Sequence, residues 1–94
     1  MSKQDLYIEK MKLQLDQLNV DMKELELKAK EAKADARDKY EEQMARLRAQ
    51  SKEAGVKLDE MKAAAADTWD KMVVDMEKVR DAFKHSFNYF KSQV

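Results

Sequence analysis

The sequence predicts an all-α protein, and three observations support this fold class. Proline is absent and Gly55 is the single glycine, so the chain lacks the residues that usually punctuate strands and tight turns. Charged residues make up 40% of the 94 residues, among many Ala, Leu and Met residues, which is typical of long helices and coiled coils. Apolar residues also recur three or four places apart, the spacing of one helix face. We therefore expect one helical domain that assembles as a helical bundle or coiled-coil oligomer.

The first expected helix covers residues from about 3 to 65. Its apolar positions follow a heptad pattern from Ile8 to Ala36, sustained over several heptads as in a coiled coil. The step from Ala36 to Tyr40 is one residue too long, so the phase of the pattern shifts there. The rhythm then continues to Ala65, and the intervening residues are mostly strong helix formers.

A second amphipathic helix is expected from about 68 to 92, after a break at the segment AAAADTWDK. The carboxylate of Asp67 can cap this helix by accepting hydrogen bonds from its first free N–H groups. Gly55 offers an alternative, a hairpin turn near residue 55, because glycine costs roughly 1 kcal/mol inside a helix. The apolar spacing runs past Gly55 without interruption, which favours the break near Ala66, but the pattern leaves both readings open.

A chain of two helices would leave its apolar stripes partly in water, and fully burying each large apolar side chain gains about 1.5–3 kcal/mol. The stripes therefore predict self-association, with a dimer or a dimer of dimers favoured by two-fold symmetry. The mixed charges beside the stripes leave parallel and antiparallel packing open. The predicted self-association interface consists of Ile8, Met11, Leu15, Leu18, Met22, Leu25, Leu47, Leu58, Met61, Trp69, Met72, Met76, Val79, Phe83, Phe87 and Phe90.

A second apolar row lies on the opposite side of the first expected helix. Leu6, Leu13, Val20 and Leu27 recur every seven residues, about 200° away from the Ile8 stripe. A simple two-stranded coiled coil leaves such positions in water. A helix that is apolar on two sides calls for neighbours on two sides, either in a bundle of more than two helices or in a contact between assemblies.

Residue types that carry chemistry are sparse, so we expect no enzymatic activity, no cofactor and no metal site. The single histidine, His85, follows Asp81 by four residues, which is typical of a surface pair on a helix. There is no cysteine, and the seven methionines fit a role in adaptable packing better than a copper site. Nineteen basic residues balance nineteen acidic ones, which argues against a nucleic-acid partner.

Residues 69–90 raise the question of a membrane partner, because this aromatic-rich stripe would also suit a helix lying on a lipid surface. Its polar side carries both signs in balance, so anionic lipid gains nothing by electrostatic attraction. We therefore expect a non-enzymatic structural or protein-interaction module that self-associates, with the second helix also available to another protein. The alternative is an amphipathic-helix protein that binds lipid or a membrane surface. No stretch is apolar enough to span a bilayer or to serve as a secretory leader, so a cytoplasmic location is expected.

The segments MSKQDLYIEKMKLQLDQLN, AKEAKADARDKYEEQ and DTWDK together resemble a group of small uncharacterised bacterial coiled-coil proteins. These are rich in Ala, Glu and Lys and carry a tryptophan in the C-terminal helix. The resemblance covers nearly the whole chain and implies a bacterial helical protein with a break before the Asp-Thr-Trp segment. It implies no catalytic or ligand-binding residue.

Overall fold

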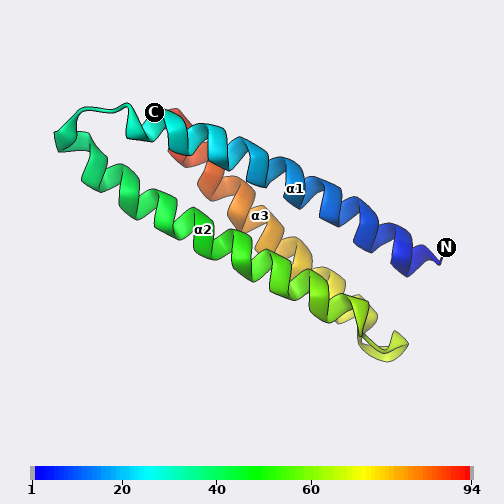
Figure 1. Cartoon of the computed structure of the whole chain (residues 1–94). Helices are drawn as coiled ribbons and strands as arrows, with labels where there is room; N and C mark the ends of the chain where they lie inside the picture. Colours follow the sequence, from blue (N-terminus) through cyan, green and yellow to red (C-terminus); the bar gives the residue numbers. More distant parts are fainter. Residues whose placement is uncertain (1, 94) are drawn as a thin grey trace.

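The computed structural model describes residues 2–93, and within them every long element is an α-helix (Figure 1). The all-α fold class is therefore confirmed for the described part of the chain, where no strand occurs. The elements in chain order are α1 (Lys3–Lys30), α2 (Ala34–Lys62), the short 3-10 turn η1 (Ala66–Thr68) and α3 (Trp69–Gln93).

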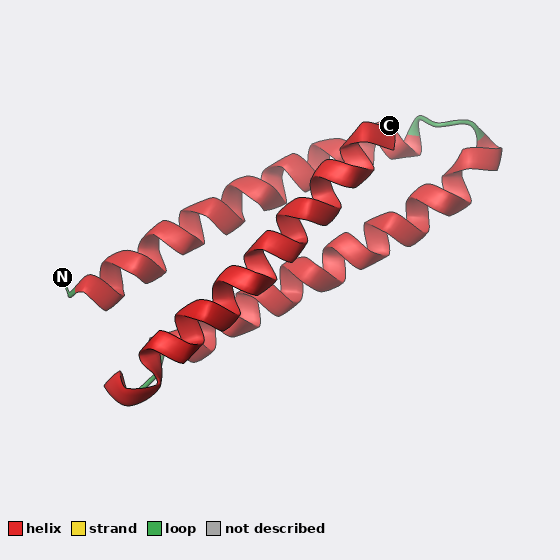
Figure 2. Ribbon diagram, turned by 180° about the vertical axis from the view of Figure 1, so that it is seen from behind, coloured by secondary structure: helices red, strands yellow, loops and turns green. Residues whose placement is uncertain are grey.

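The three helices lie side by side in an elongated shape of 50 × 20 × 18 Å. Consecutive helices run in opposite directions, and the two connections lie at opposite ends of the long axis (Figures 1 and 2). Helix α2 packs extensively against both α1 and α3, whereas α1 and α3 touch each other less. As a result, one side of α1 faces the other helices and the opposite side faces solvent.

The prediction of one continuous helix over residues 3–65 is wrong. Helix α1 ends at Lys30, the chain turns at residues 31–33, and α2 starts at Ala34. The three turn residues are helix formers with no local reason to break the helix. The reason is tertiary, because turning back lets α1 bury its apolar stripe against α2 and α3 of the same chain. Hydrophobic burial of this kind outweighs local propensity.

Polar groups satisfy the backbone at the start and end of α1. Ser2 and Asp5 form a reciprocal capping box, in which the Ser2 hydroxyl accepts a hydrogen bond of 3.1 Å from the Asp5 N–H. At the other end, the N–H of Ala32 donates to the carbonyl of Ala29 at 3.2 Å. The guanidinium of Arg37, in the first turn of α2, donates to the carbonyl of Ala32 at 3.1 Å. The turn is thus held by groups from both helices.

The alternative hairpin near Gly55 is also wrong, because α2 continues through this residue to Lys62. The second reversal occurs at residues 63–65, and α3 then starts and ends within one residue of the expected bounds 68 and 92. The expected capping role of Asp67 is not observed. Instead, the η1 turn leads directly into α3, and the hydroxyl of Thr68 donates to the carbonyl of Ala65 at 3.1 Å.

The core forms a single cluster along the inner faces of all three helices. Its largest fully buried side chains are Met11, Leu47, Met76, Phe83 and Phe90. The aromatic residues come from α3, and the methionines fill the spaces between helices as flexible, polarisable side chains do. No charged or polar residue is buried among the described residues, so the core relies on apolar packing alone.

Candidate interaction surface

The residues predicted to join two copies lie inside one chain. Eleven of the sixteen are buried in the core, and the other five are partly buried and packed against it. The periodicity correctly identified which helix faces are covered, but the cover comes from helices of the same chain. The interpretation of these residues as a self-association interface is therefore corrected. The buried members are Met11, Leu15, Met22, Leu25, Leu47, Leu58, Met61, Met76, Phe83, Phe87 and Phe90, and the partly buried members are Ile8, Leu18, Trp69, Met72 and Val79.

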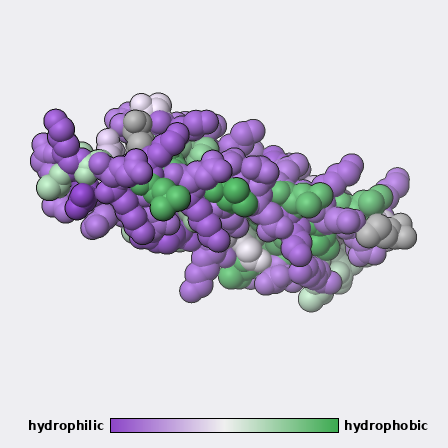
Figure 3. Space-filling model, turned by 45° about the horizontal axis from the view of Figure 1, so that its top comes forward, coloured by the Kyte–Doolittle hydropathy of each residue, from purple (hydrophilic) through white to green (hydrophobic). Residues whose placement is uncertain are grey.

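The second apolar row of α1, in contrast, remains exposed to solvent. The exposed fractions are 44% for Leu6, 64% for Leu13, 52% for Val20 and 63% for Leu27. We call these four residues the outer stripe. A row of separate hydrophobic patches surrounded by hydrophilic surface is visible on the face that Figure 3 brings forward. Single exposed leucines are common on protein surfaces, but four apolar residues repeated every seven positions along one helix form a regular row.

Charged residues border the outer stripe on both sides. Residues three positions after each stripe residue lie on one side of it on the helix surface, and residues four positions after it, or three positions before it, lie on the other side. The first row consists of Glu9, Asp16, Lys23 and Lys30, and the second row consists of Lys3, Lys10, Gln17, Glu24 and Glu31. All nine side chains are exposed. The ion pairs of the described residues involve other groups, so within residues 2–93 these exposed charges have no salt-bridge partner.

The other large apolar side chains at the surface are isolated. Val56 on α2 and Val74 and Tyr89 on α3 are about half exposed, at 49%, 51% and 56%. They are not arranged at regular helical intervals along one face. They therefore represent ordinary surface exposure and serve as internal controls for the outer stripe.

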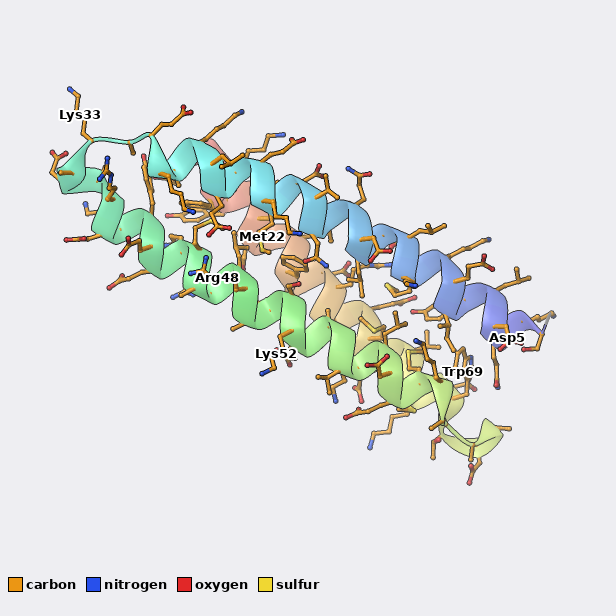
Figure 4. The ribbon with its side chains drawn as sticks, in the orientation of Figure 1. Asp5, Met22, Lys33, Arg48, Lys52 and Trp69 are labelled. Atoms are coloured by element: carbon orange, nitrogen blue, oxygen red, sulfur yellow. The ribbon has the colours of Figure 1, made fainter. Side chains whose placement is uncertain are left out.

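Polar contacts tie α1 to its neighbours on its inner side. Glu26 of α1 pairs with Arg48 of α2 at 2.9 Å, and Arg48 projects into the space between these helices (Figure 4). The Ser51 hydroxyl of α2 donates a hydrogen bond to the side-chain oxygen of Asn19. Toward α3, the guanidinium of Arg80 donates to the side-chain oxygen of Gln14 at 3.2 Å. These contacts fix the rotation of α1 about its axis and so hold the outer stripe outward.

An open groove of about 580 Å³ lies between the C-terminal half of α1 and the start of α2. Ala29, Tyr40 and Met44 form its apolar part. The basic groups beside it include Arg37 and Arg48, and both already have partners within the chain. Lys30 and Glu41 also line the groove, form no ion pair among the described residues, and are exposed. Their charges are opposite, so they do not form a set of like groups of the kind that orients a charged small ligand.

A polar and aromatic cluster lies where α1 begins and α3 begins. The Tyr7 ring packs edge to face on Trp69, with centroids 5.7 Å apart, and its hydroxyl donates to Glu77 Oε1 at 3.3 Å. Burial, and after it the neighbouring Glu77 carboxylate, raises the pKa of Tyr7 from 10.0 to about 12. This raised pKa keeps the phenol protonated and able to donate, which suits a structural clasp between the two helices.

His85 lies exposed on α3, and no group of three or more His, Cys, Asp or Glu side chains within residues 2–93 is placed to hold a metal ion. None of the described helices combines the length and apolar character that crossing a bilayer requires. Comparison with protein-family models, curated proteins and solved structures found no match to this chain.

Proposed function

We propose that this chain is a non-enzymatic structural or interaction module that self-associates by packing helices against one another. The observation that carries the proposal is the outer stripe, which leaves one helix apolar on its solvent side after the core is complete. A regular apolar row on an otherwise charged surface is a typical docking feature of helical proteins.

The energetics favour a reversible contact. Fully burying one Leu or Val side chain gains about 1.5–3 kcal/mol, and the stripe residues are already partly covered, so each gains less than this. Association itself costs an estimated 4–15 kcal/mol in lost translational and rotational freedom. Four such side chains per copy therefore supply a modest net affinity. A contact that forms and dissociates with protein concentration is the expected behaviour of the module.

Light scattering after gel filtration, over a series of protein concentrations, tests the proposal. The measured mass should rise with concentration to at least twice the 11.0 kDa of one chain. A single-chain mass at every concentration would overturn self-association. A flotation assay with liposomes of zwitterionic and of anionic lipid tests the lipid-binding alternative. A lipid-binding protein floats with the vesicles, whereas an interaction module remains in the fraction without vesicles.

A further inference from the structure

We infer that the outer stripe packs against the outer stripe of a second copy, with the two α1 helices parallel and in register. This inference rests on the proposed self-association and specifies its surface and orientation. It starts from a property of the two charged rows. In the first row the residues change from acidic to basic along the helix, and in the second row they change from basic to acidic.

The order of signs makes α1 complementary to a copy of itself. When two identical helices pack in parallel around a two-fold axis, the first row of one faces the second row of the other at the same height. Glu9 then meets the partner's Lys10, and Lys23 meets the partner's Glu24. Lys30 likewise meets the partner's Glu31. By symmetry each pair forms twice, and no like charges oppose one another.

The antiparallel arrangement is less favourable at its centre. There each row faces the same row of the partner in reverse, so Glu9 meets the partner's Lys23 and Lys10 meets the partner's Glu24. The centre of the first row is Asp16, which lies opposite the partner's Asp16. Two carboxylates are then brought together on the two-fold axis, whereas the parallel register places Asp16 beside the partner's Gln17. Exposed ion pairs add little affinity, but avoiding a like-charge contact selects the orientation.

A second copy also fits the outer stripe better than a lipid surface does. The nine bordering positions carry four acidic and four basic residues, Gln17 being neutral, so the face has no net charge. An anionic membrane would attract half of these groups and repel the other half. A surface that is neutral overall but ordered in sign along its length is complementary to a partner with the same order.

Two charge-swapped variants test the inference without changing the net charge. The first, E9K/K23E, reverses the first row, and the second, K10E/E24K, reverses the second row. In the parallel register each variant alone places like charges together on both flanks. We expect its self-association to weaken at least tenfold in sedimentation equilibrium. An equimolar mixture should restore association as a heterodimer, because the reversed row of one variant then faces the reversed row of the other.

The antiparallel register predicts a different pattern, since reversing one row leaves that row complementary to itself. The parallel pairing would be overturned if each variant alone self-associated with the dissociation constant of the wild type and the mixture showed no preference for the heterodimer. A matched pair of apolar substitutions tests the stripe itself. Leu13→Glu should abolish the dimer, whereas Val74→Glu, at a similarly exposed residue of α3, should leave its dissociation constant unchanged. Equal effects of these two substitutions would place the contact elsewhere.

These results separate the inference from the proposed function. Suppose that the wild-type chain associates but that neither Leu13→Glu nor the charge swaps weaken the association. The proposed self-association then stands, and the inference that the outer stripe is the contact surface is wrong. If the wild-type chain is a monomer at all concentrations, the proposed self-association and the inference about the outer stripe are both wrong. Circular-dichroism melting of every variant confirms that the helices remain folded, which is expected because all six substituted positions are exposed.

Discussion

Tyr7 and Trp69 pack edge to face, with ring centroids 5.7 Å apart and ring planes at 81°. The contact joins the first turns of α1 to the first residue of α3 and thereby closes one end of the structure. The opposite end is formed by the turn at Lys33, far from Trp69 along the long axis (Figure 4). Edge-to-face aromatic pairs contribute about 0.5–1.5 kcal/mol beyond their buried area, so this contact helps hold α1 and α3 together where they otherwise touch little.

The Tyr7 clasp predicts a specific loss of stability in alkali. The folded-state pKa of Tyr7 is about 12 against 10.0 for a free phenol, so the folded chain holds this proton more tightly. The stabilisation is complete below pH 10.0 and is lost as the pH rises through about 12. In Tyr7→Phe, the fall in melting temperature over this interval should be smaller than in the wild type.

Ultraviolet titration of the phenolates provides the direct measurement, because the chain has three tyrosines. Tyr7→Phe should remove the component that titrates last, and Tyr89→Phe should leave that component in place. If the last component persists in Tyr7→Phe, the hydroxyl of Tyr7 is not held by Glu77 as described.

Phe83 is predicted to be a sensitive core position on α3, because its large side chain is 0% exposed. Phe83→Ala should lower the free energy of unfolding by about 3–5 kcal/mol, since it removes a buried ring and leaves a cavity. Phe83→Leu removes less volume and should cost less, which keeps the measurement useful if the alanine variant fails to fold. Urea denaturation followed by circular dichroism gives both values.

The control for Phe83 is Tyr89 on the same helix, which is 56% exposed. Tyr89→Ala should change the free energy of unfolding by no more than about 0.5 kcal/mol, as surface substitutions usually do. Similar losses at Phe83 and Tyr89 would mean that α3 does not present this face to the core.

Gly55 is predicted to be a site where stability can be gained. The residue lies inside α2, and a Cβ added there would meet no atom within 4 Å. Glycine in a helix interior costs roughly 0.5–1 kcal/mol relative to alanine, so Gly55→Ala should raise the free energy of unfolding by about this amount. Ala45→Gly, at an exposed position of the same helix, should lower it to a similar extent. A loss of stability in Gly55→Ala would indicate a turn at this residue.

Much of the fold could be predicted because helix periodicity is a local property of the sequence. The apolar spacing of residues such as Met11, Leu47 and Phe83 identified the buried faces, and each of these residues is buried. The same spacing cannot tell which helix covers a face, because an apolar face can be buried equally well by a helix of the same chain or by a helix of a second copy. This is why the core was interpreted as a contact between copies.

The turn after α1 could not be predicted for a related reason. Glu31, Ala32 and Lys33 favour a helix, and the free energy that breaks it comes from packing residues distant in sequence. The one local signal was the phase shift between Ala36 and Tyr40, close to the observed turn. The outer stripe was recognisable from its seven-residue repeat, but its exposure depends on how α1 is rotated in the folded chain.

Ala34→Pro distinguishes the observed turn from a continuous helix by the sign of its effect. Ala34 is the first residue of α2, where proline is favoured because the N–H there has no partner within the helix. Lys33 before it has φ −62° and ψ 151°, the extended conformation that a residue preceding proline requires. The substitution should therefore raise the free energy of unfolding by about 0.4–1 kcal/mol, because it restricts the unfolded chain.

In a continuous helix over residues 3–65, the same proline would lie in the interior and cost about 3 kcal/mol or more. Ala45→Pro, inside α2, is the matched control and should cause a loss of this size. Urea denaturation of the two variants beside the wild type measures both effects. Because every other residue is unchanged, a large loss in Ala34→Pro could come only from a helix that passes through residue 34, and the turn between α1 and α2 would then be disproved.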